Sequence, residues 1–436
     1  MEFIFILGIL LVLGLISTRL MKVLNLPNVT GYLIIGLLAA FVCLLIDKIN
    51  GNDAITNSLS SLNYNVSGVA LGFIALSIGE EFKTSKIKGF GSKIISITFL
   101  QAFSAMILVD IVVLVICYLL KAPLEVAICV GAIATATAPA ATLMVIHQYK
   151  AKGPMVDLLL PVVALDDALG LIFFSISVSV SKVIAVGAMP TIQSLIIIPL
   201  IEILGSLLLG LLLGFLLRVI IHYFKSRNNH VITLIAFTLI GVGACYLLNK
   251  IQINGSHLEF SNLLCCMMIG ATYINIGEDS QIVERDFSLV ERWTPSLFML
   301  FFVLSGAHLV TSARELLSMD TNMLIVLIIF LGYIIARSAG KYFGSYLGCK
   351  LTNRQKSITK YLGITLLPQA GVAIGMANTI SSMEAFNNGS GSIIVTVVLC
   401  ATLVYELFGP LLTKWSLEKA GEIPDLDGNY PCENYK

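Results

Sequence analysis

The stretch PVVALDDALG, residues 161–170, decides the fold class of this chain. It places Asp166 and Asp167 side by side in the middle of an apolar run long enough to cross a bilayer. An ionised carboxylate at the bilayer centre costs roughly 2.5–3.5 kcal/mol, so two of them are expensive to keep there. We therefore interpret both as binding an ion or protons in transit.

The composition agrees with a membrane protein. Hydrophobic residues make up 57% of the 436 residues and charged residues only 12%, against about a quarter charged in soluble domains, and the mean hydropathy is +0.93. A net charge of +1 gives no sign of a nucleic-acid partner. The nine cysteines lack the spacing of a zinc site or of a disulfide framework, so no metal or other cofactor is expected.

Thirteen apolar segments match the roughly 20 residues that a helix needs to span a bilayer. They are too long and too uniformly apolar for the strands of a barrel, so the predicted fold is an all-α polytopic membrane protein. Cytoplasmic loops carry an excess of Lys and Arg, which places the N-terminus outside and the C-terminus in the cytoplasm. On that assignment the outer loops hold only five basic residues, namely Lys48, Lys121, Lys182, Lys250 and Arg314.

The positions of the spans also predict an internal repeat. A shift equal to the separation of Pro139 and Pro368 moves spans one to six onto spans eight to thirteen. Because the shift covers seven spans, an odd number, the second copy is inverted in the membrane. Inverted repeats of this kind are typical of secondary transporters, whose sites lie at the midplane between interrupted helices.

Two spans contain such interruptions. Span five includes GAIATATAPA, residues 131–140, and span twelve includes LLPQAGVAIG, residues 366–375. A proline within a span removes a backbone donor and frees polar groups that lipid cannot satisfy. An ordinary proline kink would explain either span alone, but the matching places favour a functional reading. The residues expected to support the unwound segments are Thr135, Thr137, Pro139, Pro368 and Gln369.

The basic partners of the aspartates are expected in span eleven. Arg337 and Lys341 lie four residues apart and share one helical face. Neighbouring helical residues point about 100° apart, so Asp166 and Asp167 face different surroundings. Lys341 is the base whose protonation could change, since arginine stays protonated. A purely structural ion pair is the alternative.

Two further acids in the membrane region are weaker candidates. Asp110 falls close to the repeat-related counterpart of Lys341, where a structural role is equally compatible with the sequence. Asp157, at the cytoplasmic side of span six, could line an access funnel.

Together these motifs resemble a known family. TATAP at residues 135–139, LDD at 165–167, Arg337 with the Gly340-Lys341 step, and LPQAG at 367–371 are similar to the monovalent cation:proton antiporters of the Kef and NapA branch. LPNVTGY at 26–32 adds weaker agreement.

The resemblance implies an NhaA/NapA-like antiporter fold with two crossing interrupted helices, and a homodimer whose cores move like elevators. By this likeness the dimerisation part is residues 1–90 and 229–320, the core is 91–185 and 321–415, the linker helix is 186–228, and 416–436 is a short cytoplasmic tail.

The same resemblance assigns roles to individual residues. Asp167 looks like the essential carrier of ion and proton, and Asp166 like the neighbour that pairs with Lys341. The adjacent Asp166-Asp167 pair is similar to the pair found in the electrogenic members of the family. Some relatives have an aspartate where this chain has Ala138, which leaves the choice of cation open. The nucleotide-binding domain of Kef channels is not expected after the last span.

The predicted function is therefore the exchange of Na⁺, K⁺ or Li⁺ for H⁺ by competition at the paired aspartates, in a bacterial plasma membrane and in contact with lipid. No enzyme activity is expected, and the absence of a P-loop argues against an ATP-driven pump. The alternatives are a Kef-type K⁺ efflux channel, a solute symporter on a similar scaffold, and a sensor with an inactive site.

Overall fold

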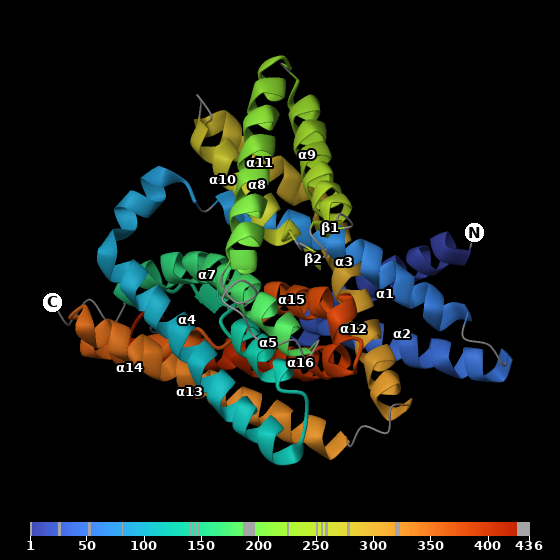
Figure 1. Ribbon diagram of the computed structural model, residues 1–436. Helices are drawn as coiled ribbons and strands as arrows, with labels where there is room; N and C mark the ends of the chain where they lie inside the picture. The colour runs from blue at the N-terminus through green and yellow to red at the C-terminus, as the bar shows by residue number, and fades with distance from the viewer. Residues whose placement is uncertain are drawn as a thin grey trace.

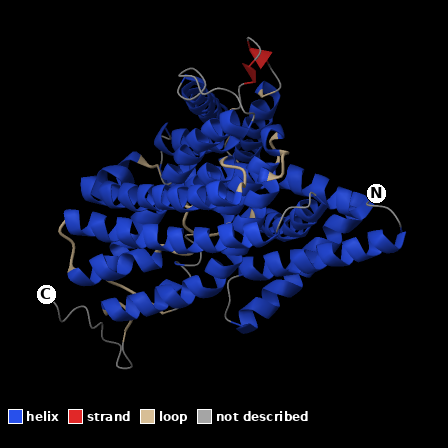
Figure 2. Ribbon diagram, turned by 60° about the horizontal axis from the view of Figure 1, so that its bottom comes forward, coloured by secondary structure: helices blue, strands red, loops and turns tan. Residues whose placement is uncertain are grey.

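The computed structural model of the protein is a bundle of helices (Figure 1, Figure 2). In its described part, every regular element is helical except the antiparallel pair β1 (Gln252–Ile253) and β2 (Ser256–His257). Ten of the described helices are long and apolar enough to cross a membrane. The structure describes residues 2–24, 28–50, 54–80, 82–138, 142, 145–146, 149–185, 197–224, 226–249, 252–253, 256–257, 260–276, 280–318 and 323–424.

One group of helices packs around α12 (Pro295–Ser318) and α10 (Asn262–Ile276). Gly36 and Gly306 let α2 (Asn28–Asn50) approach the backbone of α12, because a β-carbon on either would overlap a carbonyl group of the other helix. Gly79 and Gly270 do the same for α3 (Ala54–Glu80) and α10. The other members of this group are α1 (Glu2–Leu24), α8 (Ile198–His222), α9 (Arg227–Leu248) and the short α11 (Ser280–Trp293).

The long helices α4 (Thr84–Leu120) and α13 (Met323–Leu351) lie side by side (Figure 1). Gly340, Gly344 and Gly348 recur every four residues along the face of α13 that meets α4. A β-carbon on Gly340 would lie 2.6 Å from the Cα of Ala105, and one on Gly348 would lie 2.9 Å from that of Ile97. The two backbones are therefore in direct contact, as small residues allow between membrane helices.

Two broken segments meet beside α13. The helix α5 (Glu125–Ile133) ends before residues 134–138, which are non-helical, and α14 (Lys356–Thr365) is separated from α15 (Gly371–Ser381) by residues 366–370. The Ala138 amide donates to the Pro368 carbonyl over 2.8 Å. The side-chain amide of Gln369 donates to the Ile133 carbonyl over 3.0 Å. Each break thus satisfies polar backbone groups of the other, which lipid could not do.

The helix α7 (Pro154–Ala185) carries the two aspartates. Its first turn is capped by Glu422, whose carboxylate accepts hydrogen bonds from the amides of Met155 at 2.6 Å and Val156 at 2.9 Å. A negative group at a helix N-terminus accepts hydrogen bonds from the free amides and interacts favourably with the positive end of the helix dipole. Glu422 follows the end of α16 (Ser390–Ala420), which the 3₁₀ turn η2 (Glu384–Phe386) precedes.

The helical fold class expected from the sequence is confirmed. Besides the ten long helices, Asn262–Ile276 is apolar but shorter, and the expected spans five and twelve are the broken segments just described. The count of thirteen spans and their inverted relation stay predictions.

Candidate ion-binding site

Asp166 and Lys341 form an ion pair at the centre of the core. The Lys341 Nζ lies 2.7 Å from an Asp166 carboxylate oxygen, and both side chains are completely buried. Asp166 comes from the middle of α7 and Lys341 from the middle of α13. The pairing expected from the sequence is present in this structure.

Gln101 on α4 joins the two charges. Its amide nitrogen donates to the second carboxylate oxygen of Asp166, and its carbonyl oxygen accepts from Lys341 over 2.7 Å. This residue was missed by the sequence analysis. A buried amide in the apolar span of α4 is the only signal the sequence offers, and it does not say which helix the amide faces.

The break after α5 supplies the other contacts. The Thr137 hydroxyl donates to the Asp166 carboxylate and accepts from Lys341 over 2.9 Å. The backbone carbonyl of Thr135 also accepts from Lys341, while its hydroxyl donates to the Ala132 carbonyl over 2.7 Å within its own turn. Close approach of α7 depends on Gly170, because a β-carbon there would lie 2.8 Å from the Thr135 hydroxyl.

Arg337 lies one turn before Lys341, and its side chain bonds backbone carbonyls of the two broken segments. Its guanidinium donates to the carbonyls of Ala134 at 3.0 Å, Ala136 at 2.7 Å and Leu367 at 2.7 Å, and it packs over the Tyr405 ring with 4.5 Å between the two centres. We expected Arg337 to take part in the ion pair. In the described part of the chain it contacts no carboxylate, and it bridges the two breaks instead.

Gln369 and Tyr333 complete the support of the breaks. The Gln369 side chain exchanges hydrogen bonds with the Tyr333 hydroxyl at 2.9–3.0 Å as well as reaching Ile133. Pro368 contributes its carbonyl to Ala138, as described above. The expected supporting role of Pro139 lies outside the described residues.

Among the remaining predicted residues, Asp110 and Asp157 have side chains that the structure describes, and neither is brought together with the ion pair. Asp167 occupies a helical position in α7, but its side chain lies outside the described part of the structure. Asp110 on α4 packs against Gly131 of α5, and one of its buried carboxylate oxygens has no hydrogen-bond partner among the described residues. Asp157 is exposed in the first turn of α7.

The arrangement has the chemistry of a competition site. A buried carboxylate is stable only with a proton, a cation or a basic partner close by. Here the Asp166 carboxylate is contacted by the Lys341 ammonium, the Thr137 hydroxyl and the Gln101 amide, beside two broken helices. Half-helix ends and unwound carbonyls are the groups that bind ions in secondary transporters.

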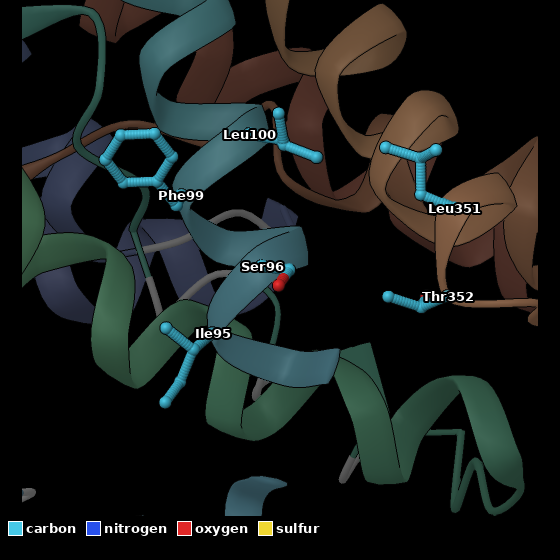
Figure 3. Close-up of a pocket in the computed structure, with 6 residues that line it drawn as sticks. All are labelled: Ile95, Ser96, Phe99, Leu100, Leu351 and Thr352. Atoms are coloured by element: carbon cyan, nitrogen blue, oxygen red, sulfur yellow. The ribbon is translucent and has the colours of Figure 1, made fainter. Parts of the chain in front are cut away.

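A separate pocket opens between the N-terminal half of α4 and the C-terminal end of α13. Figure 3 shows Ser96 and Leu100 on one side and Leu351 and Thr352 on the other, and Ile95 and Phe99 complete the lining. None of these side chains is charged, and none contacts Asp166 or Lys341 through a recorded hydrogen bond. The buried pair, and not this pocket, is therefore the candidate ion site.

Known proteins resemble the chain as follows. The family described as "Sodium/hydrogen exchanger, transmembrane" matches residues 7–415. The fold is similar to the solved structure of the sodium proton antiporter MjNhaP1 from Methanocaldococcus jannaschii at pH 8. The TM-score is 0.69 at 18% identity, over 96% of this chain and 99% of the other. Comparison with curated protein sequences gives no match.

Proposed function

Because the chain belongs to the sodium/hydrogen exchanger family, we propose that it is a secondary active antiporter that exchanges Na⁺, or K⁺ or Li⁺, for H⁺. Family membership supports the class of transport. The observation that carries the location of the site is the fully buried Asp166–Lys341 pair, held by side chains and carbonyls of a broken segment. No enzyme activity and no resident cofactor is part of this proposal.

The coupling follows from the pair. A cation that binds beside the Asp166 carboxylate repels the ammonium group of Lys341, so the lysine proton is released as the cation enters. When a proton returns to Lys341, the same repulsion expels the cation. Protons and cations therefore compete for the same acidic site, and each is released when the other binds.

Asp167 is proposed as the principal carrier, with Asp166 as its paired neighbour. Oxygen ligands from the Thr137 hydroxyl and from those carbonyls of residues 134–138 that Arg337 and Lys341 do not hold would complete the shell of a dehydrated monovalent cation, as carbonyls do in ion-selective proteins. Two carboxylates and one lysine allow unequal charges to move in the two directions. The exchange is accordingly proposed to be electrogenic.

The movement is proposed to be elevator-like. The core would comprise residues 91–185 and 321–415, and residues 1–90 and 229–320 would form the dimerisation part, with 186–228 as the linker. A bare carboxylate crosses an apolar interface poorly because of its desolvation cost. The site would therefore cross the membrane only when it carries a cation or protons. The close backbone contact of α4 with α13 supports the idea that these two helices move as one body.

The finer architecture is also part of the proposal. It includes thirteen spans in two inverted repeats, a place in the Kef and NapA branch, and a homodimer in the lipid of a bacterial plasma membrane. The N-terminus would face outside and the C-terminus the cytoplasm, as the bias of Lys and Arg supports.

A transport assay tests the function. Purified protein in liposomes, with a pH dye inside, receives Na⁺, K⁺ or Li⁺ in separate runs. We expect cation-driven proton movement with the native protein and none with Asp167→Asn or with Asp166→Asn. Exchange at the native rate in both variants would refute the site, and the absence of exchange for all three cations would refute the function.

The same liposomes separate the antiporter from a K⁺ channel. A channel gives a current that reverses near the K⁺ equilibrium potential and is indifferent to a pH gradient. An electrogenic antiporter gives a reversal potential that shifts when either the cation gradient or the pH gradient is changed.

A further inference from the structure

The outer half of α12 carries a line of polar side chains on one helical face. Ser305, His308, Ser312 and Glu315 are separated by three or four residues, which places them on one side of the helix. Glu315 at the outer end is exposed, Ser312 and Ser305 are buried, and His308 between them is partly buried. The polar line thus runs from the outer end of α12 towards the middle of the membrane.

This line faces helices that follow the second break. The Nδ1 of His308 lies 3.0 Å from the Asn378 side-chain oxygen, and the Asn378 amide nitrogen donates to the Ser305 hydroxyl over 3.1 Å. Nearer the surface, the Ser392 hydroxyl donates to the Glu315 carboxylate over 2.5 Å. Asn378 belongs to α15 and Ser392 to α16, so these bonds join the proposed dimerisation part to the proposed core.

Deeper contacts of the same interface are apolar. A β-carbon on Gly371, at the start of α15, would lie 3.3 Å from the Phe302 ring of α12. The Leu71 side chain of α3 fills the space beside Gly375. The polar line therefore ends about two turns outward from the break that borders the ion pair, since Asn378 lies seven residues after Gly371.

The polar line is more than packing requires. The Ser312 hydroxyl is buried and has no hydrogen-bond partner among the described residues. A buried, unpartnered polar group lowers the stability of a fold, and polar residues within membrane spans are retained mainly for function. Alanine at position 312 would fit the same space without that cost.

We propose that Ser305, His308, Ser312 and Glu315 form the outer access route for the hydrated monovalent cation, closed in this structure by Asn378 and Ser392. This proposal rests on the antiport function and on the predicted orientation. Opening separates α12 from α15 and α16, breaks the three hydrogen bonds and exposes Ser312 to water. Glu315 attracts the cation at the mouth, and the hydroxyls and the imidazole replace part of its hydration on the way inward.

Cysteine labelling tests the route. Ser312→Cys is exposed to a membrane-impermeant methanethiosulfonate reagent from the outer side of intact cells, and the modified site is identified by mass spectrometry because the chain has nine native cysteines. The matched control is Thr272→Cys on α10, another buried hydroxyl without a recorded partner, which lies away from the line. We expect labelling at position 312 and none at 272.

A second variant tests the closure. Asn378→Ala removes two of the three bonds that close the route, so we expect labelling of Ser312→Cys to accelerate about fivefold or more, the effect of losing one ordinary hydrogen bond. Thr379→Ala is the control, since its hydroxyl bonds only the Gly375 carbonyl of its own helix. Equal labelling rates in the two backgrounds would contradict the closure.

Exchange is measured on the same variants, so the two proposals can fail separately. If the native protein exchanges cations for protons but Ser312→Cys is never labelled from outside, the access route is wrong and the antiport function stands. If Ser312→Cys is labelled but no exchange occurs, the antiport function is wrong.

Discussion

The backbone amide of Ala138 donates to the carbonyl of Pro368 over 2.8 Å, so the two broken segments are hydrogen-bonded to each other. Next to this contact the Thr137 hydroxyl lies against the ion pair, whereas the Thr135 hydroxyl bonds the Ala132 carbonyl of its own turn. Two threonines of one short motif thus have different surroundings, and the difference can be measured.

Thr137→Val should weaken cation exchange far more than Thr135→Val. The first change removes a hydroxyl that contacts both Asp166 and Lys341, whereas the second removes one that bonds only the Ala132 carbonyl. Hydrogen bonds to charged groups contribute about 1.5–3 kcal/mol, so we expect the apparent cation affinity of Thr137→Val to fall about tenfold or more. The apparent affinities of both variants are measured with the pH dye over a range of cation concentrations. Equal losses of affinity in the two variants would show that the Thr137 hydroxyl has no special role in the site.

Lys341→Gln should destabilise the fold strongly at alkaline pH. It leaves the Asp166 carboxylate buried without its counter-charge, which typically costs about 3–5 kcal/mol. The double variant with Asp166→Asn should recover most of the loss, because no buried charge remains unpaired. Thermal unfolding in detergent measures both, with Lys350→Gln, an exposed lysine on the same helix, as the control. A Lys341→Gln protein as stable as the control would refute the pairing.

Gly344→Ala should separate α4 from α13. A β-carbon at Gly344 would lie 2.5 Å from the Leu100 carbonyl oxygen and 2.7 Å from the Cα of Gln101. Overpacking of this kind costs about 1–3 kcal/mol, and it shifts Gln101 away from Lys341. We expect a lower unfolding temperature together with reduced exchange. Gly243→Ala on α9, where nothing lies within 4 Å of the added carbon, should be neutral.

Glu422 should make stability depend on pH. Burial raises the pKa of its carboxyl above the ordinary value of 4.5, the amides of Met155 and Val156 lower it in part, and the Asp157 carboxylate raises it again. A carboxyl whose pKa is raised by folding binds its proton more tightly in the folded state. The free energy of unfolding therefore falls as the pH rises from 4.5 through the raised value.

The test compares unfolding temperatures of the native protein and Glu422→Gln at acid and at neutral pH. We expect the variant to gain stability relative to the native protein as the pH rises. Glu418→Gln, at a position whose side chain is 46% exposed, serves as the control and should show no such change. A native-to-variant difference that is constant across the pH range would contradict the raised pKa.

The sequence predicted the charged centre better than its surroundings. Asp166 and Lys341 were found because charges in apolar spans are rare and costly, and the breaks were found because prolines interrupt helices. The carbonyl partners of Arg337 could not be predicted, since backbone groups carry no sequence signal. Gln101 and the polar line of α12 depend on which helices become neighbours. The four-residue spacing of Gly340, Gly344 and Gly348 marks a packing face on α13, but the sequence does not say which helix packs there.

Arg337 has a mechanical consequence. Its guanidinium donates hydrogen bonds to carbonyl oxygens of both broken segments, two after α5 and one after α14. Neither segment can therefore move alone without losing hydrogen bonds to a permanent positive charge. We therefore expect the two broken segments to move together as one rigid unit. The flexible parts of the molecule would then lie at its periphery, where connecting segments bend while the centre keeps its shape.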